Sequence, residues 1–172
     1  RPLKTASVRL LVTLLVWRGS RQNTTLSGTL KNMLIVVDTG GTKTLVTSFD
    51  RAGRMGEQFK FPTPKGTHDY IRTLGQLLRD QYGHRSVDAL VVAIPGIIKY
   101  GVALWCNNLE WKNFDVAASL KGVLGGAPVF IENDANLAGL AETRQLHPLP
   151  GLSLYVTVST GIGSDIIING DI

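Results

Sequence analysis

Cysteine and long apolar runs are scarce in this sequence, and each shortage excludes a class of protein. The 172 residues contain one cysteine, Cys106, so the chain forms no internal disulfide and no zinc site from several of its own cysteines. Because Cys106 follows Trp105, we expect it to be a small buried side chain rather than a nucleophile. The apolar stretch at residues 8–17 is too short to cross a bilayer. We therefore expect no membrane partner, and the lone cysteine fits a cytoplasmic protein.

Acidic residues are absent from the first 32 positions, which hold six of the chain's 18 Lys and Arg residues. The net charge of +5 comes from this segment, since the remainder carries 12 basic and 13 acidic residues. We expect residues 1–32 to be an extension outside the fold, disordered or artefactual. The nearly neutral main body leads us to expect no nucleic acid as a partner.

From residue 33 onward, the apolar pattern predicts an α/β fold. Strands are predicted at residues 33–38, 43–49, 55–61, 88–94, 128–132, 152–159 and 165–170. Helices are predicted from a cap at Thr67, at 114–124 and at 134–143, whereas residues 97–105 give mixed signals. Three consecutive strands followed by alternating helices and strands indicate a mixed sheet with helices packed on it.

The first candidate site is the turn between the first two predicted strands, where Asp38 precedes two glycines. Gly40 and Gly41 would let the backbone approach a phosphate closely, with exposed N–H groups. Thr42 can donate a hydroxyl, and Asp38 can hold Mg²⁺ directly or through water. The spacing does not match a Walker P-loop. Taken alone, the turn is equally well explained as a glycine-rich hairpin with a solvated aspartate.

A second glycine turn contains Gly161 and Gly163, and it also follows an apolar strand. It does not match the dinucleotide-binding G-x-G-x-x-G pattern, because residue 166 is Ile. Two phosphate-type turns in one chain are less expected by chance than one.

Polar residues gather at a third place, where a predicted strand ends and a helix begins: Glu132, Asn133, Asp134 and Asn136. A helix cap explains one of them. Ligands of open α/β sheets bind at the carboxyl ends of strands, where a carboxylate could accept a proton from a substrate hydroxyl. We expect the helix N-terminus to lower the pKa of Asp134, which phosphoryl transfer tolerates.

These motifs together resemble the ROK family of sugar kinases and sugar-responsive repressors, within the actin/hexokinase superfamily. The likeness runs from residue 33 to residue 172 through "DTGGTKT", "AIPGII", "CNNLEW", "IENDANLAGLAE" and "VSTGIG". It implies an actin-like ATPase (ribonuclease H-like) fold, with a first lobe at 33–132 and a truncated second lobe at 133–172.

The resemblance also implies the activity, which is Mg²⁺- and ATP-dependent phosphorylation of a glucose-like hexose, commonly at the 6-OH. Asp134 would be the catalytic base. The sugar pocket would be lined by Gly96, Asn108, Asn133 and Asp134. The nucleotide phosphates and Mg²⁺ would be bound by Asp38, Gly40, Gly41, Thr42 and Lys43, and from the other side by Thr160 and Gly161.

Two departures from the family pattern matter. Ser164 and Asp165 stand where the family usually has more glycine, and an acid there could repel a phosphate. The family's later sugar contacts, adenine pocket and cysteine-rich motif, which could hold a structural zinc, have no counterpart here. We therefore expect this chain alone to be an inactive fragment with exposed apolar surface, and the full-length protein to be a homodimer.

Other functions stay open at this point. The first is a ROK-type sugar-sensing repressor, although residues 1–32 are too short for a winged helix-turn-helix. The second is a plain binding module or a decayed fragment, in which the polar cluster is only a helix cap. The resemblance does not fix the sugar: glucose is the family default, and the alternatives are fructose, allose, N-acetylglucosamine and N-acetylmannosamine.

Overall fold

The computed structural model of the chain describes residues 32–158 and 162–172. The prediction for residues 1–32 therefore lies almost wholly outside the described residues. The described part divides into two compact units, one ending at Asn133 and one beginning at Asp134. Each is described by itself.

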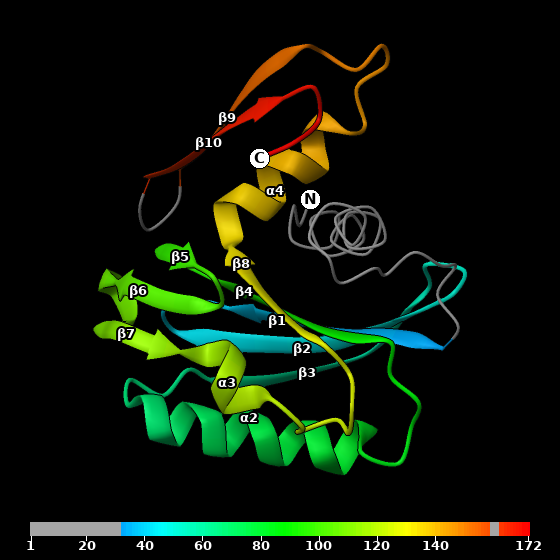
Figure 1. The fold of residues 1–172 in the computed structure, drawn as a ribbon, viewed down its shortest axis with the longest axis vertical. Coiled ribbons are helices and arrows are strands. Elements are labelled where there is room, and N and C mark those ends of the chain that lie inside the picture. Colours follow the sequence, from blue (N-terminus) through cyan, green and yellow to red (C-terminus); the bar gives the residue numbers. More distant parts are fainter. Residues whose placement is uncertain (1–31, 159–161) are drawn as a thin grey trace. The chain divides into compact units, whose positions relative to one another are not determined.

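The first unit is built on a five-stranded mixed sheet with the strand order β3-β2-β1-β4-β8 (Figure 1). β2 pairs antiparallel with both β1 and β3, whereas β1–β4 and β4–β8 pair in parallel. The strands are β1 (Met33–Thr39), β2 (Lys43–Asp50), β3 (Met55–Pro62), β4 (Ala89–Ile94) and β8 (Val129–Asn133). All six residues of β4 are buried, as expected for a central strand with an unbroken apolar run.

The long helix α2 (Thr67–Tyr82) covers one face of this sheet (Figure 1). Its buried face repeats every fourth residue, at Tyr70, Leu74, Leu78 and Tyr82, and packs against sheet residues such as Ile35 and Val46. The predicted face was right at its centre, whereas Ile71 and Leu77 are only partly buried. The cap prediction was wrong: Gly66 occupies the N-cap position, and the helix begins at Thr67.

A small antiparallel sheet, β5-β6-β7, occupies the stretch that gave mixed signals. It consists of β5 (Ile97–Lys99), β6 (Val102–Cys106) and β7 (Trp111–Asp115), with the 3-10 turn η1 (Asn107–Leu109) between the last two. The helix predicted at 114–124 is shorter, because its first two residues belong to β7. α3 (Val116–Leu120) begins after Asp115, whose carboxylate accepts a hydrogen bond from the Ala118 N–H at 2.8 Å. An N-cap acid fixes the helix start.

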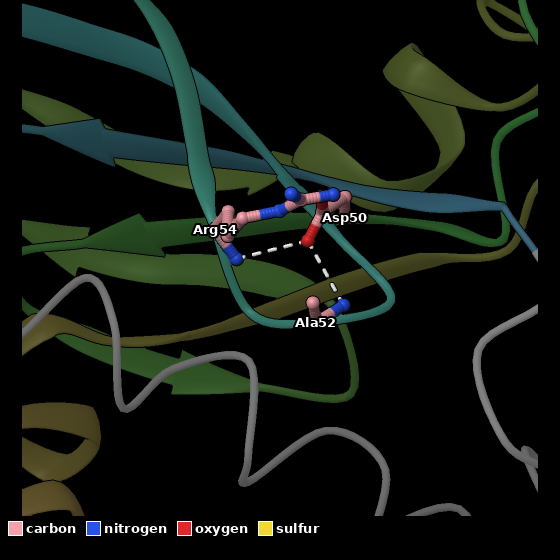
Figure 2. A network of polar contacts seen from close by, with 3 residues as sticks. All are labelled: Asp50, Ala52 and Arg54. Carbon is pink, nitrogen blue, oxygen red and sulfur yellow. Dashed lines mark hydrogen bonds and ion pairs between the residues drawn. The ribbon is translucent and has the colours of Figure 1, made fainter.

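The turn between β2 and β3 is organised by one carboxylate, that of Asp50 (Figure 2). Its Oδ1 accepts hydrogen bonds from the backbone N–H groups of Ala52 and Arg54, both at 2.9 Å. Its Oδ2 pairs with Arg54 Nε at 2.7 Å. These hydrogen bonds, led by the one from the Arg54 backbone, lower the pKa of Asp50. Gly53 supplies the left-handed residue of the turn, with φ +71°.

The described residues of the second unit, 134–158 and 162–172, form a helix and an antiparallel strand pair. α4 (Asp134–Thr143) packs on the antiparallel pair β9 (Leu152–Val158) and β10 (Ile162–Ile168). Leu140, Ala141 and Ile167 form a small buried cluster between them. β10 begins three residues before its predicted start at residue 165.

Candidate sugar and phosphoryl-donor site

The carboxyl ends of three neighbouring parallel strands lie at one edge of the five-stranded sheet. The registers pair Asp38 of β1 with Ala93 of β4, and Ala93 with Glu132 of β8. Asp38 and Glu132 are therefore two strands apart, which corresponds to about 10 Å between their backbones. The glycine turn and the strand-end polar cluster thus begin at the same sheet edge.

The glycine turn joins β1 to β2, and its shape depends on small residues. The N–H of Gly40 donates to the carbonyl of Lys43 at 3.0 Å, so this N–H closes the turn rather than facing a ligand. A Cβ at Gly40 would stand 3.0 Å from the same carbonyl oxygen. Asp38 is half-buried at the entrance of the turn, whereas Thr42 and Lys43 are exposed.

Gly96 lies between β4 and β5 with φ +121°, a backbone conformation that side chains rarely adopt. A Cβ there would meet the carbonyl oxygen of Trp105 at 2.2 Å, so the close approach of two backbones requires glycine. The carbonyl of Gly96 accepts a hydrogen bond from Asn133 Nδ2 at 2.7 Å. This bond joins two predicted sugar-pocket residues.

Asn108 lies in η1 and packs directly against the glycine turn. A Cβ built on Gly41 would stand 3.3 Å from the Asn108 Cβ, so the two residues are close neighbours with little room for a side chain at position 41. Within the unit that ends at Asn133, the structure therefore brings Asn108 to the glycine turn. It also brings Asn133 to Gly96.

Asp134 is the next residue, the first of α4, and belongs to the second unit. Its Oδ1 accepts a hydrogen bond from the Ala135 N–H at 2.9 Å. We expected the helix N-terminus to lower its pKa, and that expectation was wrong. Burial disfavours the charged carboxylate and raises the pKa of Asp134, outweighing the backbone hydrogen bonds that lower it. A raised pKa makes the carboxylate a stronger base than a solvated aspartate.

Two predicted donor contacts, Thr160 and Gly161, lie outside the described residues. The residues that follow them are described. Ser164 is on the exposed face of β10, whereas Asp165 is half-buried on the opposite face with Gly163. That face packs on α4, since a Cβ at Gly163 would stand 3.1 Å from the Ala135 Cβ. Asp165 therefore takes a place in the helix–hairpin packing of its own unit.

Several residues that support the site were not singled out from the sequence. The Thr39 and Tyr70 hydroxyls are hydrogen-bonded at 2.7 Å in the core. Burial, with a smaller effect from the charge of Asp38, raises the pKa of Tyr70 well above its usual range. The Tyr70 ring packs on Trp111 at 4.7 Å between centroids, and Trp111 packs on Phe114. Only the tertiary structure brings these residues to the site, so no local sequence signal identifies them.

A sequence model of the ROK family matches residues 34–172. The chain belongs to the ROK family. The predicted resemblance to the ROK family is thereby confirmed.

Among characterised relatives, polyphosphate glucokinase of Mycobacterium tuberculosis is 33% identical over 142 residues, covering 78% of this chain and 52% of the relative. N-acetylmannosamine kinase of Yersinia pestis is 31% identical over 141 residues, covering 78% of this chain and 47% of the relative. The chain thus spans about half the length of these relatives.

Among solved structures, the inorganic polyphosphate/ATP-glucomannokinase of Arthrobacter matches with a TM-score of 0.68 and 34% identity, over 82% of this chain and 60% of that one. A ROK glucokinase of Streptomyces griseus, in complex with glucose and AMPPNP, matches with a TM-score of 0.66 and 25% identity, over 81% and 45%. A ROK transcriptional regulator gives a TM-score of 0.70 at 18% identity, which shows the fold alone. The predicted actin-like fold, of which this chain covers part, is confirmed.

None of the helices in residues 32–158 and 162–172 combines the length and the apolar character needed to cross a membrane.

Proposed function

We propose that this ROK chain supplies sugar- and donor-binding residues of a kinase that transfers a phosphoryl group from ATP to a glucose-like hexose, at the 6-OH. The observation that carries the proposal is the contact between the glycine turn and Asn108, at the sheet edge where the Asn133–Gly96 hydrogen bond also lies. A donor-binding turn packed against a sugar-binding loop would bring the two substrates together, and positioning of this kind is a large part of phosphoryl-transfer catalysis.

Asp134 is the residue we assign as the base in this reaction. As the new O–P bond forms and the donor's P–O bond breaks, the sugar hydroxyl gives its proton to the Asp134 carboxylate. The raised pKa of Asp134 fits this role, because a base must hold the proton that it removes. The side-chain Nδ2 of Asn133 donates a hydrogen bond to the carbonyl of Gly96. Asn133 would therefore fix the backbone at Gly96 and also offer its side-chain oxygen to the sugar.

The glycine turn is the part that would bind the donor. The N–H groups of Gly41 and Thr42 have no acceptor among the described residues and are available to phosphate oxygens. Asp38 would hold Mg²⁺ and Thr42 could assist. Within the described residues, no three His, Cys, Asp or Glu side chains gather as a metal site. The Asp38 carboxylate fits Mg²⁺, which commonly takes one or two carboxylates together with water and donor phosphates and would supply charge neutralisation at the phosphoryl group.

The phosphoryl donor is the finer point that the relatives leave open. Two of them are named for polyphosphate, and one of these two is named for both polyphosphate and ATP. We propose ATP as the donor, and a parallel assay with inorganic polyphosphate decides between the two.

The test is an assay of the full-length protein with glucose, N-acetylmannosamine and mannose, using each donor in turn. We expect glucose phosphorylation by the wild type and a loss of at least about a thousandfold in kcat for Asp134→Asn, which keeps the shape but removes the base. The matched control is Asp69→Asn, which removes an exposed carboxylate paired with Arg72 on α2 and should leave activity unchanged. Glucose binding without phosphoryl transfer by the wild type would contradict the kinase proposal and favour the sugar-sensing regulator.

A further inference from the structure

The four-residue segment between β3 and α2, residues 63–66, touches both halves of the proposed site. Its first residue, Thr63, is buried and holds the glycine turn. The Thr63 hydroxyl donates to the carbonyl of Gly40 at 2.8 Å, and its N–H donates to the carbonyl of Thr42 at 3.0 Å. Because the Thr63 proton is used on Gly40, the Thr44 hydroxyl must donate in the 2.9 Å bond between the two threonines. Two hydrogen bonds from one residue, Thr63, therefore hold the turn, one from its side chain and one from its backbone.

Two residues later, Lys65 holds the loop that carries Asn108. The carbonyl of Lys65 accepts a hydrogen bond from Trp111 Nε1 at 2.7 Å, and Trp111 is only 2% exposed. This bond fixes the backbone of Lys65 on a buried ring. From that anchored position the Lys65 ammonium donates to the carbonyl of Asn108. Lys65 therefore contacts both ends of the loop, at residues 108 and 111.

The loop itself has a reason to need such support. Glu110, directly after η1, has φ +61°. Residues other than glycine pay a conformational penalty in this region and stay there only when their surroundings hold them. The same loop presses Asn108 against Gly41, so a shift of the loop would move the sugar-binding residue relative to the donor turn.

We propose that Lys65 is a positioning residue that sets the Asn108 loop against the glycine turn and so couples sugar binding to donor binding. The proposal rests on the kinase function proposed above. Lys65 touches the carbonyl of Asn108 rather than either substrate. Its effect is to fix the peptide plane at residue 108, so that Asn108 meets the sugar while Gly41 meets the donor. Misplacement of such groups by about 1 Å can cost orders of magnitude in rate.

The kinetic test compares Lys65→Met, which keeps the aliphatic stem but removes the donor, with Lys65→Arg, which keeps a donor. The matched control is Lys60→Met, because Lys60 is an exposed lysine on β3 outside the proposed site. We expect Lys65→Met to raise the KM for hexose and to lower kcat/KM about tenfold, roughly the effect of losing one hydrogen bond to a charged group. Lys65→Arg should recover most of the loss, and Lys60→Met should match the wild type.

A second measurement separates this proposal from the kinase assignment. Hydrogen–deuterium exchange of amides 107–110 should be faster in Lys65→Met than in the wild type or Lys60→Met, whether or not the protein transfers phosphoryl groups. Equal exchange in all three proteins would overturn the positioning role. Faster exchange in a protein without transfer activity would keep the role of Lys65 in the loop and overturn the kinase function.

Discussion

Asp134 is the residue at which local and long-range physics disagree. Its place as the first residue of α4 favours the charged carboxylate, whereas burial favours the neutral acid, and burial has the larger effect on its pKa. Only a raised pKa moves the protonation of this carboxylate to a higher pH than that of an ordinary aspartate.

This difference predicts how activity depends on pH. Because Asp134 must be deprotonated to accept the hydroxyl proton, kcat/KM should fall as pH falls through its folded-state pKa, which lies above the ordinary value of 3.8. The measurement is a pH–rate profile of the full-length protein, with buffers and donor charge controlled. An acid limb at or below the ordinary aspartate value would contradict the raised pKa.

The raised pKa of Asp134 also predicts how the free energy of unfolding depends on pH. A carboxyl with a raised folded-state pKa binds its proton more tightly in the folded protein, so its stabilising effect is present at low pH and is lost as pH rises through that pKa. Asp134→Asn should therefore have a higher urea midpoint than the wild type at neutral pH and little difference in strong acid. Equal midpoints at neutral pH would speak against a costly buried charge.

Among the secondary-structure elements, the contact between β1 and α2 depends on one buried hydroxyl pair. Thr39 ends β1 beside the glycine turn, and Tyr70 lies in the first turns of α2. Their 2.7 Å hydrogen bond is buried, so removing one partner leaves the other without its bond in the core.

A double-mutant cycle tests this pair. We expect Tyr70→Phe or Thr39→Val alone to lower the free energy of unfolding by about 1–2 kcal/mol. The double variant should lose clearly less than the sum, because both polar atoms are then gone. Urea unfolding followed by circular dichroism measures all four proteins, and strictly additive losses would show that the bond contributes nothing.

Two stretches of secondary structure were left unassigned or were wrongly assigned from the sequence. The stretch 97–105 has Gly101 with φ +82° and Tyr100 with φ +51° at one hairpin turn, which broke the apolar pattern into pieces too short to assign. The apolar spacing from Phe114 to Leu124 predicted a helix, yet Phe114 pairs with Ala103 in the small sheet. Pairing with the preceding strand, β6, overrode the local helical period at residues 114 and 115.

At the scale of the whole molecule, the hairpin of the second unit leaves one apolar face exposed. Seven side chains on that face are between 53% and 79% exposed: Leu152, Leu154, Val156, Val158, Ile162, Ile166 and Ile168. The opposite face packs on α4. The expectation of exposed apolar surface agrees with this face, and surfaces of this kind mark places where another layer or molecule packs.

This face predicts self-association of the 172-residue chain. Leu154→Lys should lower both the associated fraction in sedimentation velocity and the fluorescence of a bound apolar dye such as ANS, because it places a charge in the middle of the apolar row. Leu146→Lys is the matched control, an exposed leucine in the same unit outside the hairpin. An unchanged sedimentation profile for Leu154→Lys would show that the hairpin face does not drive association.

The amino-acid sequence alone was enough to predict the strands of the central sheet, the helix at residue 67, the glycine turn after Asp38 and the polar cluster around the start of α4. It could do so because apolar periodicity and turn chemistry are local properties of the chain. Three features could be seen only in the tertiary structure. Asn108 packs on Gly41, Thr63 and Lys65 hold the glycine turn and the Asn108 loop, respectively, and Asp134 is buried enough to raise its pKa. These contacts of Asn108, Thr63 and Lys65 join residues between 23 and 67 positions apart in the chain, and no local pattern records which distant segment will cover a residue.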